Sequence, residues 1–177
     1  AARAGVLAWL WDGRIIRHFI ETNALGAASI LDIDEGRGGA LWLSTASGLL
    51  RFAPATAKFE PAFPGEPITN LAAVASRETT SGERWTLFIG PAASIGSNSN
   101  NAWLACRRNG AWLKKPDLST AELAVNAPSA FMVEDPLGSL WFTGDADGLH
   151  RRVNGQVQCI RVLRRSEADW TLTAFSD

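Results

Sequence analysis

The sequence contains no tyrosine, two histidines, two cysteines and one methionine among 177 residues. His18 and His150 lie far apart without metal-ligand spacing, so we interpret both as surface or strand residues. Cys106 and Cys159 form no CxxC pair, which argues against a cysteine metal cluster and favours small buried residues, while a disulfide between them stays open. We therefore expect no cofactor and no metal site.

A dominant charge of one sign is also missing. Seventeen basic and eighteen acidic residues nearly cancel, so the composition indicates neither a nucleic-acid partner nor an acidic membrane surface. The longest apolar runs, such as residues 5–11, are too short to span a bilayer, and the first residues lack the layout of a signal peptide. We expect either a cytosolic chain or a piece of a longer protein whose targeting and membrane segments lie elsewhere.

Motifs for common catalytic chemistry are absent as well. The sequence has no Asp-x-Gly-x-x-Trp box, no Gly-x-Ser-x-Gly elbow and no glycine-rich phosphate loop before a helix. Asp32, Asp34 and Glu35 could form an acid–base cluster, but they stand where a predicted strand meets a turn. Asp145 and Asp147 resemble a calcium loop that lacks its later ligands. We predict that this chain is not an enzyme.

What the sequence does contain is a repeated segment. Residues 29–52 read SILDIDEGRGGALWLSTASGLLRF, and residues 129–152 read SAFMVEDPLGSLWFTGDADGLHRR. Each has a strand, an acid, a glycine turn, Leu-Trp, a second turn and a Gly-Leu pair. Trp42 and Trp141 lie 99 residues apart, which corresponds to two periods of about 50 residues, a spacing typical of propellers or solenoids.

Short apolar runs bounded by Gly, Pro, Asn and Asp indicate β-strands along the whole chain, and helical periodicity is poor. The dipeptides at 12–13, 109–110 and 154–155 are typical of type I′ hairpin turns. Residues 40–43 and 140–142 are apolar at consecutive positions, which indicates burial on both faces, as in the middle strands of a propeller blade. The predicted strands are 6–11, 14–19, 29–33, 40–45, 48–52, 58–63, 70–75, 84–89, 102–107, 111–115, 130–134, 139–143, 148–153, 156–162 and 171–175.

We predict an all-β fold, a single β-propeller segment of four-stranded blades over residues 1–177. Its full blades are 29–63, 70–115 and 130–162, with partial blades at 1–20 and 170–177. Residues 94–101, within the middle blade, read as a solvated loop. The incomplete ends predict either a closed ring of four blades or, as we favour, a segment of a larger propeller, because open blade faces and edges are costly. The expected partners are the remaining blades or a second copy of the chain.

The repeat motif can be assigned residue by residue. Its positions are Asp34, Gly39, Trp42, Thr45, Gly48 and Arg51 in the first unit, and Asp135, Gly138, Trp141, Gly148 and Arg151 in the third. We expect structural roles for them: glycine allows positive φ, the indole fills the gap between blades, and the aspartate caps turn amides. Aligning Asp34 with Asp135 requires two extra residues in the first turn, and the middle unit keeps little beyond Trp85 and residues 102–104.

These residues match the pattern D-x-x-G-x-L-W-x-x-T-x-x-G-L-x-R. The pattern resembles the repeat of the two-component regulator propeller family. Such propellers form the sensor region of bacterial hybrid histidine kinases. The resemblance implies a periplasmic or otherwise extracytoplasmic sensor, whose ligand-driven rearrangement is passed through an immunoglobulin-like domain and a transmembrane helix to a kinase.

We therefore expect a non-catalytic sensory module of a two-component protein that binds a small polar molecule or a saccharide. The sequence assigns no ligand-binding residue. The arginine pairs at 107–108, 151–152 and 164–165 would favour acidic saccharides if they converged on one face. Two other functions stay open: a propeller enzyme of the streptogramin-lyase type, which needs metal-binding groups at the central channel, and a protein-binding scaffold.

Overall fold

The computed structural model describes residues 7–11, 14–19, 29–53, 58–64, 66, 68, 71–91, 100–116, 123–125, 130–143 and 148–161. Within these ranges the chain forms strands and one short 3-10 helix, η1 (Arg37–Gly39), and it contains no α-helix. Accordingly, no helix in this part of the chain is long and apolar enough to cross a membrane. The predicted strand 171–175 and the turn at 12–13 lie outside the described residues, as do Asp145 and Asp147.

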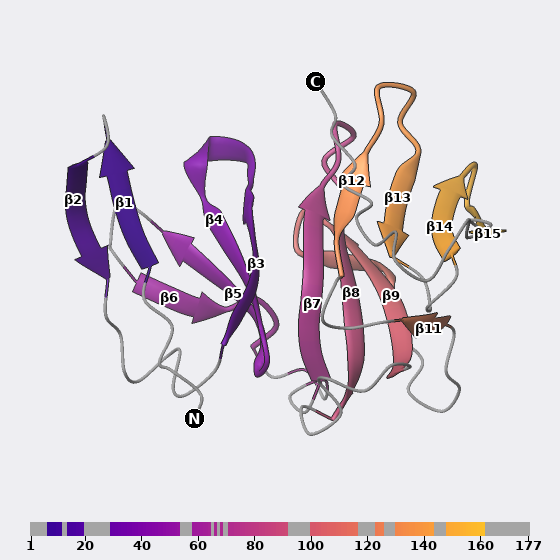
Figure 1. The fold of residues 1–177 in the computed structure, drawn as a ribbon, viewed down its shortest axis with the longest axis horizontal. Helices are drawn as coiled ribbons and strands as arrows, with labels where there is room; N and C mark the ends of the chain where they lie inside the picture. The colour runs from indigo at the N-terminus through magenta and orange to yellow at the C-terminus, as the bar shows by residue number, and fades with distance from the viewer. Residues whose placement is uncertain are drawn as a thin grey trace, which may run out of the picture.

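The strands form a two-stranded sheet and three larger antiparallel sheets (Figure 1). The N-terminal hairpin consists of β1 (Leu7–Trp11) and β2 (Arg14–Phe19). Sheet 1 contains β3 (Ile30–Glu35), β4 (Leu41–Thr45), β5 (Gly48–Ala53) and β6 (Lys58–Pro61). Sheet 2 contains β7 (Leu71–Glu78), β8 (Arg84–Pro91), β9 (Asn100–Arg108), β10 (Ala111–Lys114) and β11 (Leu123–Val125). Sheet 3 contains β12 (Met132–Glu134), β13 (Leu140–Thr143), β14 (Gly148–Val153) and β15 (Gln156–Arg161).

Each larger sheet pairs four strands in chain order, so each is an antiparallel meander, the organisation of a propeller blade. The first strands of the three sheets lie next to one another, with β7 in contact with both β3 and β12. Figure 1 shows β7 and β12 side by side, with sheet 1 on one side and β14 and β15 on the other. This arrangement fits a propeller-like fold. The described strands do not close into a ring.

Most predicted strands appear at or near their predicted positions. Both Asn-Gly turns within the described residues, 109–110 and 154–155, have positive φ at both residues, as a type I′ turn requires. The sequence did not predict β11. We also predicted a loop over residues 94–101, but Asn100 already belongs to β9 and is paired with Val125 of β11. Asparagine is disfavoured in strands, so pairing with a distant segment overrides local propensity here.

Two of the three clusters of buried hydrophobic residues lie between the larger sheets, and the third belongs to sheet 1 alone. Buried residues between sheets 1 and 2 include Leu49, Leu71, Phe88 and Trp103, and those between sheets 2 and 3 include Trp85, Leu87, Met132 and Phe142. Strand β7 is buried over its first six residues. Sheet 2 is therefore covered on both faces, which explains why its strands are apolar at consecutive positions. Each large apolar side chain buried in this way contributes about 1.5–3 kcal/mol.

Candidate functional site

The same tight turn joins the first two strands of all three sheets. In sheet 3, the Asp135 N–H donates to the Ser139 carbonyl (2.9 Å), and the Gly138 N–H donates to the Asp135 carbonyl (2.9 Å). Both bonds recur among Thr79, Gly82 and Glu83 in sheet 2, and among Gly36, Gly39 and Ala40 in sheet 1. The glycine shared by the three turns has φ between 74° and 80°, a conformation in which a side chain is strained. Sheet 2 therefore keeps the turn of the repeat although its sequence has diverged.

This structural alignment corrects the expected place of Asp34. The residue equivalent to Asp135 is Gly36, and the turn has the same length in every sheet, so the first unit has no two-residue expansion. A Cβ atom on Gly36 would lie 2.4 Å from Nε1 of Trp42. The indole of sheet 1 thus occupies the space that an aspartate fills in sheet 3.

Asp135 caps its own turn. Its carboxylate accepts hydrogen bonds from the N–H groups of Leu137 (3.0 Å) and Ser139 (2.8 Å) and from the indole N–H of Trp141 (2.8 Å). The indole bond is the main reason why the pKa of Asp135 is lowered, and the bond from Ser139 adds to it. The carboxylate is held as an anion by the turn that it stabilises.

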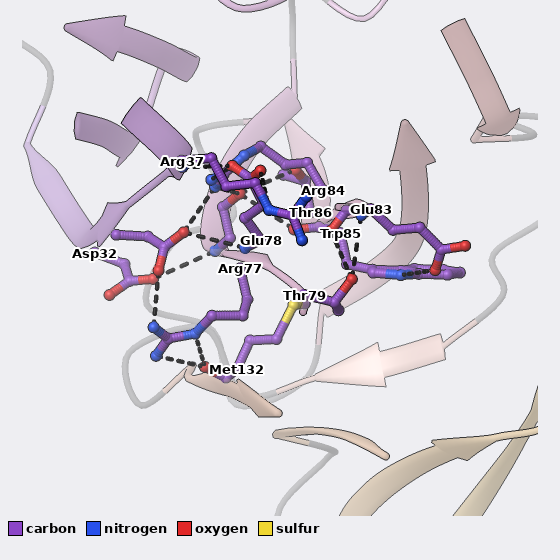
Figure 2. Close-up of polar contacts among 12 residues, drawn as sticks. Asp32, Arg37, Arg77, Glu78, Thr79, Glu83, Arg84, Trp85, Thr86 and Met132 are labelled. Atoms are coloured by element: carbon purple, nitrogen blue, oxygen red, sulfur yellow. Dashed lines mark hydrogen bonds and ion pairs between the residues drawn. The ribbon is translucent and has the colours of Figure 1, made fainter. Parts of the chain in front are cut away.

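Asp34 instead joins sheet 1 to sheet 2 as the centre of an ionic network. Its side chain is 2% exposed and accepts hydrogen bonds from Arg77 and Arg84, both at 2.8 Å, and from the Glu78 N–H at 3.1 Å. Arg84, 8% exposed, also pairs with Glu78 at 2.9 Å (Figure 2). Buried charges need such complete pairing, because their desolvation otherwise exceeds the attraction between them.

Arg77 extends this network to sheet 3. Besides Asp34, its guanidinium contacts the Met132 carbonyl through Nη2 (3.3 Å) and Nε (3.4 Å), as Figure 2 shows. On the other side, Asp32 accepts a hydrogen bond from the Ser76 N–H (3.3 Å), and burial raises the pKa of Asp32. Polar contacts therefore link the first strands of all three sheets.

A second repeated contact joins the turns of sheets 1 and 2 to the sheet that follows each of them. Glu78 accepts a hydrogen bond from the backbone N–H of Arg37 (3.2 Å), and Glu134 accepts one from the backbone N–H of Thr80 (2.7 Å). Arg37 and Thr80 are the second residues of their turns. We call this contact the turn clasp. The equivalent residue in sheet 3 is Pro136, which has no N–H and cannot take part in a clasp.

Each junction also places an arginine of the following sheet over an indole. The guanidinium carbon of Arg84 lies 4.1 Å from the ring centroid of Trp42, and that of Arg152 lies 4.0 Å from the centroid of Trp85. Cation–π contacts of this kind contribute about 0.5–2 kcal/mol. The predicted motif arginines stack less closely on the tryptophans of their own sheets, at 5.9 Å for Arg51 and 5.1 Å for Arg151.

The remaining motif positions lie at the second turn of each unit. The Thr45 hydroxyl donates to the Gly48 carbonyl (2.8 Å) and accepts from the Ser47 N–H (3.1 Å). A Cβ atom on Gly148 would lie 3.1 Å from the Ile160 carbonyl oxygen. These contacts are all within one sheet.

A cleft of about 270 Å³ opens between sheets 1 and 2. Its walls include Trp42, Arg84, Phe63, Arg107 and Trp112. Phe63 and Trp112 stack with their centroids 5.0 Å apart, and the Arg107 guanidinium carbon lies 5.2 Å and 4.8 Å from their respective centroids. We call this site the aromatic cleft.

The arginine pairs do not converge, because adjacent residues of a strand point to opposite faces. Arg107 lines the aromatic cleft, whereas Arg108 forms an ion pair elsewhere, and Arg151 and Arg152 lie over different indoles. Residues 164–165 lie outside the described part of the chain. Arg84 and Arg107, which are opposite each other on the neighbouring strands β8 and β9, both line the aromatic cleft.

His150 and the two cysteines are not among the described residues that line the cleft. His150 is buried and stacks on Phe142 with centroids 5.3 Å apart, while His18 lies on β2. Cys106 and Cys159 are free thiols; Cys106 is buried, as predicted, whereas Cys159 is exposed, so the prediction of a buried position was wrong for Cys159. Among the residues that the structure describes, no cluster of three or more His, Cys, Asp or Glu could hold a metal ion.

The fold is similar to that of the extracellular domain of BT4673 from B. thetaiotaomicron. Two crystal structures of that domain match with TM-scores of 0.54 and 0.52, each at 19% sequence identity. The match covers 81% of this chain but only 18% of the BT4673 chain. BT4673 is designated a hybrid two component system in one structure and a one component system in the other.

No protein-family model and no curated protein matches the sequence. The resemblance to two-component sensor regions is therefore confirmed as a likeness in fold.

Proposed function

We propose that this chain is part of the extracytoplasmic sensory region of a two-component signalling protein, and that its three large sheets are consecutive propeller blades. The observation that carries the proposal is the junction that recurs between them, in which a turn clasp and an arginine–indole contact join each sheet to the next. The likeness in fold to the extracellular domain of BT4673 supports it.

A non-catalytic role is supported by the state of the carboxylates near β7. Asp34 and Glu78 are engaged by arginines in a fixed network, whereas a general acid or base must be free to exchange its proton with a substrate. We infer that the module acts by binding a small polar ligand, with a saccharide as the expected class. A ligand that binds better to one packing of the blades than to another shifts the balance between them.

The outer face of sheet 3 is where a further blade or a second copy of the chain would pack. Trp141 and Leu149 lie on this face, at the positions of Trp42 and Leu49, which pack against sheet 2. Ile160, opposite Leu149, is 37% exposed. The absence of a turn-clasp donor at Pro136 implies that this junction uses the indole contact without the clasp.

Isothermal calorimetry of the intact chain against neutral and acidic oligosaccharides tests the sensory proposal. We expect saturable binding of at least one saccharide, accompanied by a rise in melting temperature. If the whole panel gave no heat and no shift, saccharide sensing would be excluded. Turnover of an oligosaccharide, together with one bound divalent ion per chain, would favour the lyase-type enzyme instead.

A further inference from the structure

We propose that the aromatic cleft binds a small carboxylate-bearing ligand of monosaccharide size, such as a uronic acid, with Arg107 as the group that holds the carboxylate. This inference rests on the proposed sensory function and specifies where the ligand binds and which chemical class it has. The evidence for it comes from comparing the junction between sheets 1 and 2 with the junction between sheets 2 and 3.

The two junctions use their arginines differently. Arg107 and Arg152 occupy equivalent places on the third strands of sheets 2 and 3. In the later junction Arg152 covers the indole of Trp85, but in the earlier junction Arg84 covers Trp42. Arg107 therefore does not cover that indole; it lies beside Phe63 and Trp112 and lines the aromatic cleft.

Arg107 also lacks a carboxylate partner among the described residues. Its guanidinium donates to the Ala62 carbonyl (3.3 Å) and to the Gly110 carbonyl, both of them neutral acceptors. The nearby carboxylate of Glu66 is already bonded to Lys115 (2.8 Å) and to the Trp112 indole (3.0 Å). A ligand carboxylate would give Arg107 the anionic partner that it lacks among the described residues.

The chemistry of the guanidinium group supports this assignment. Guanidinium groups bind carboxylates with particular strength because the bonds are charge-assisted.

The dimensions of the cleft fit one small ring. Its volume of about 270 Å³ is slightly smaller than that of typical pockets for drug-sized ligands. Trp42 and Trp112 contribute apolar surface to the lining of the cleft. Glu78 and Asn109 also line the cleft and provide partners for hydroxyl groups.

Galacturonate and galactose form a matched pair of probes, because they differ only in the carboxylate. We expect galacturonate to bind the intact chain at least tenfold more tightly than galactose in calorimetry. Arg107→Gln should weaken galacturonate binding by about 10- to 100-fold, the loss expected for a charge-assisted bond. Arg152→Gln, at the equivalent place in the next junction, should change the affinity less than twofold.

Indole ¹⁵N–¹H spectra locate the binding site. Of the eight tryptophans, Trp42 and Trp112 should shift on adding galacturonate, while Trp85 should not. If Arg107→Gln does not fold, Trp112→Leu replaces it and should also weaken binding.

Three results would overturn the proposal: an unchanged affinity in Arg107→Gln, an equal loss in Arg152→Gln, or a shift at Trp85 instead of Trp42 and Trp112. Binding of a neutral oligosaccharide without any binding of galacturonate would overturn the cleft assignment and leave the sensory function standing. If no saccharide of either kind bound, the cleft assignment and saccharide sensing would both be excluded.

Discussion

Replacing Asp34 by asparagine tests the ionic network that joins sheets 1 and 2. The substitution keeps the shape of the side chain but removes its charge, so Arg84 is left with Glu78 as its remaining carboxylate partner in the network. Breaking a buried ion pair by removing one partner costs about 3–5 kcal/mol. Arg77 adds little to this cost, because its side chain is 41% exposed and can be solvated. We expect the free energy of unfolding to fall by about 3 kcal/mol.

Urea unfolding followed by tryptophan fluorescence measures this loss. At slopes of about 1–3 kcal/mol/M, the midpoint should fall by about 1–3 M while the slope stays unchanged. Glu60→Gln, on an exposed residue of β6, is the control and should change stability by less than about 0.5 kcal/mol. A loss below about 1 kcal/mol for Asp34→Asn would refute the buried network.

Three further predictions concern packing and ionisation. Gly36→Ala should lower the free energy of unfolding by about 1–3 kcal/mol through overpacking, because its Cβ would lie 2.4 Å from an indole nitrogen. Gly138→Ala has open space around its Cβ but a φ of 77°, so it should lower the free energy of unfolding by about 1–2 kcal/mol through backbone strain alone. A neutral Gly36→Ala variant would contradict the packing around the first turn. A thiol reagent at pH 8 should label only the exposed Cys159 of the folded protein, because burial raises the pKa of Cys106 to about 11. If two thiols were labelled before unfolding, Cys106 would be accessible and this prediction would be wrong. Burial raises the pKa of Asp32, so the folded state binds that proton more tightly and loses stability as the pH rises from the usual aspartate value through the raised one. Asp32→Asn should remove this decline and be neutral or stabilising at pH 7, and a variant that keeps the decline would show that another group causes it.

The strands and the repeat could be predicted from the sequence where the fold demands a residue type. A turn glycine, a Leu-Trp pair and a Gly-Leu pair serve backbone geometry and packing, and they recur in sheets 1 and 3. Asp34 was aligned wrongly because the match relied on the type of residue. Spacing to the tryptophan is the better guide: Gly36, Thr79 and Asp135 each precede a tryptophan by six residues.

One residue of the turn clasp, the glutamate, has a counterpart in all three units of the sequence. A glutamate stands immediately before the turn in each of the three sheets, at Glu35, Glu78 and Glu134. This shared glutamate can be recognised only if the middle unit is aligned with the other two, and the sequence of the middle unit has diverged too far for a simple alignment. The matching backbone hydrogen bonds of the three turns identify the shared position.

The ionic network and the cleft could not be predicted from the sequence. Asp34 and its partners Arg77 and Arg84 are 43 and 50 residues apart along the chain. Their pairing depends on how two sheets are placed against each other, and no local pattern encodes that placement. The different placement of Arg107 and Arg152 likewise becomes visible only when two junctions are compared in space.

Double-mutant cycles on the two arginine–indole contacts test most directly whether one device joins successive sheets. The pairs are Trp42 with Arg84 and Trp85 with Arg152, each changed to leucine singly and together, with stability measured by urea unfolding. The account predicts a favourable coupling free energy of about 0.5–2 kcal/mol in both pairs. Coupling indistinguishable from zero in both pairs would contradict it.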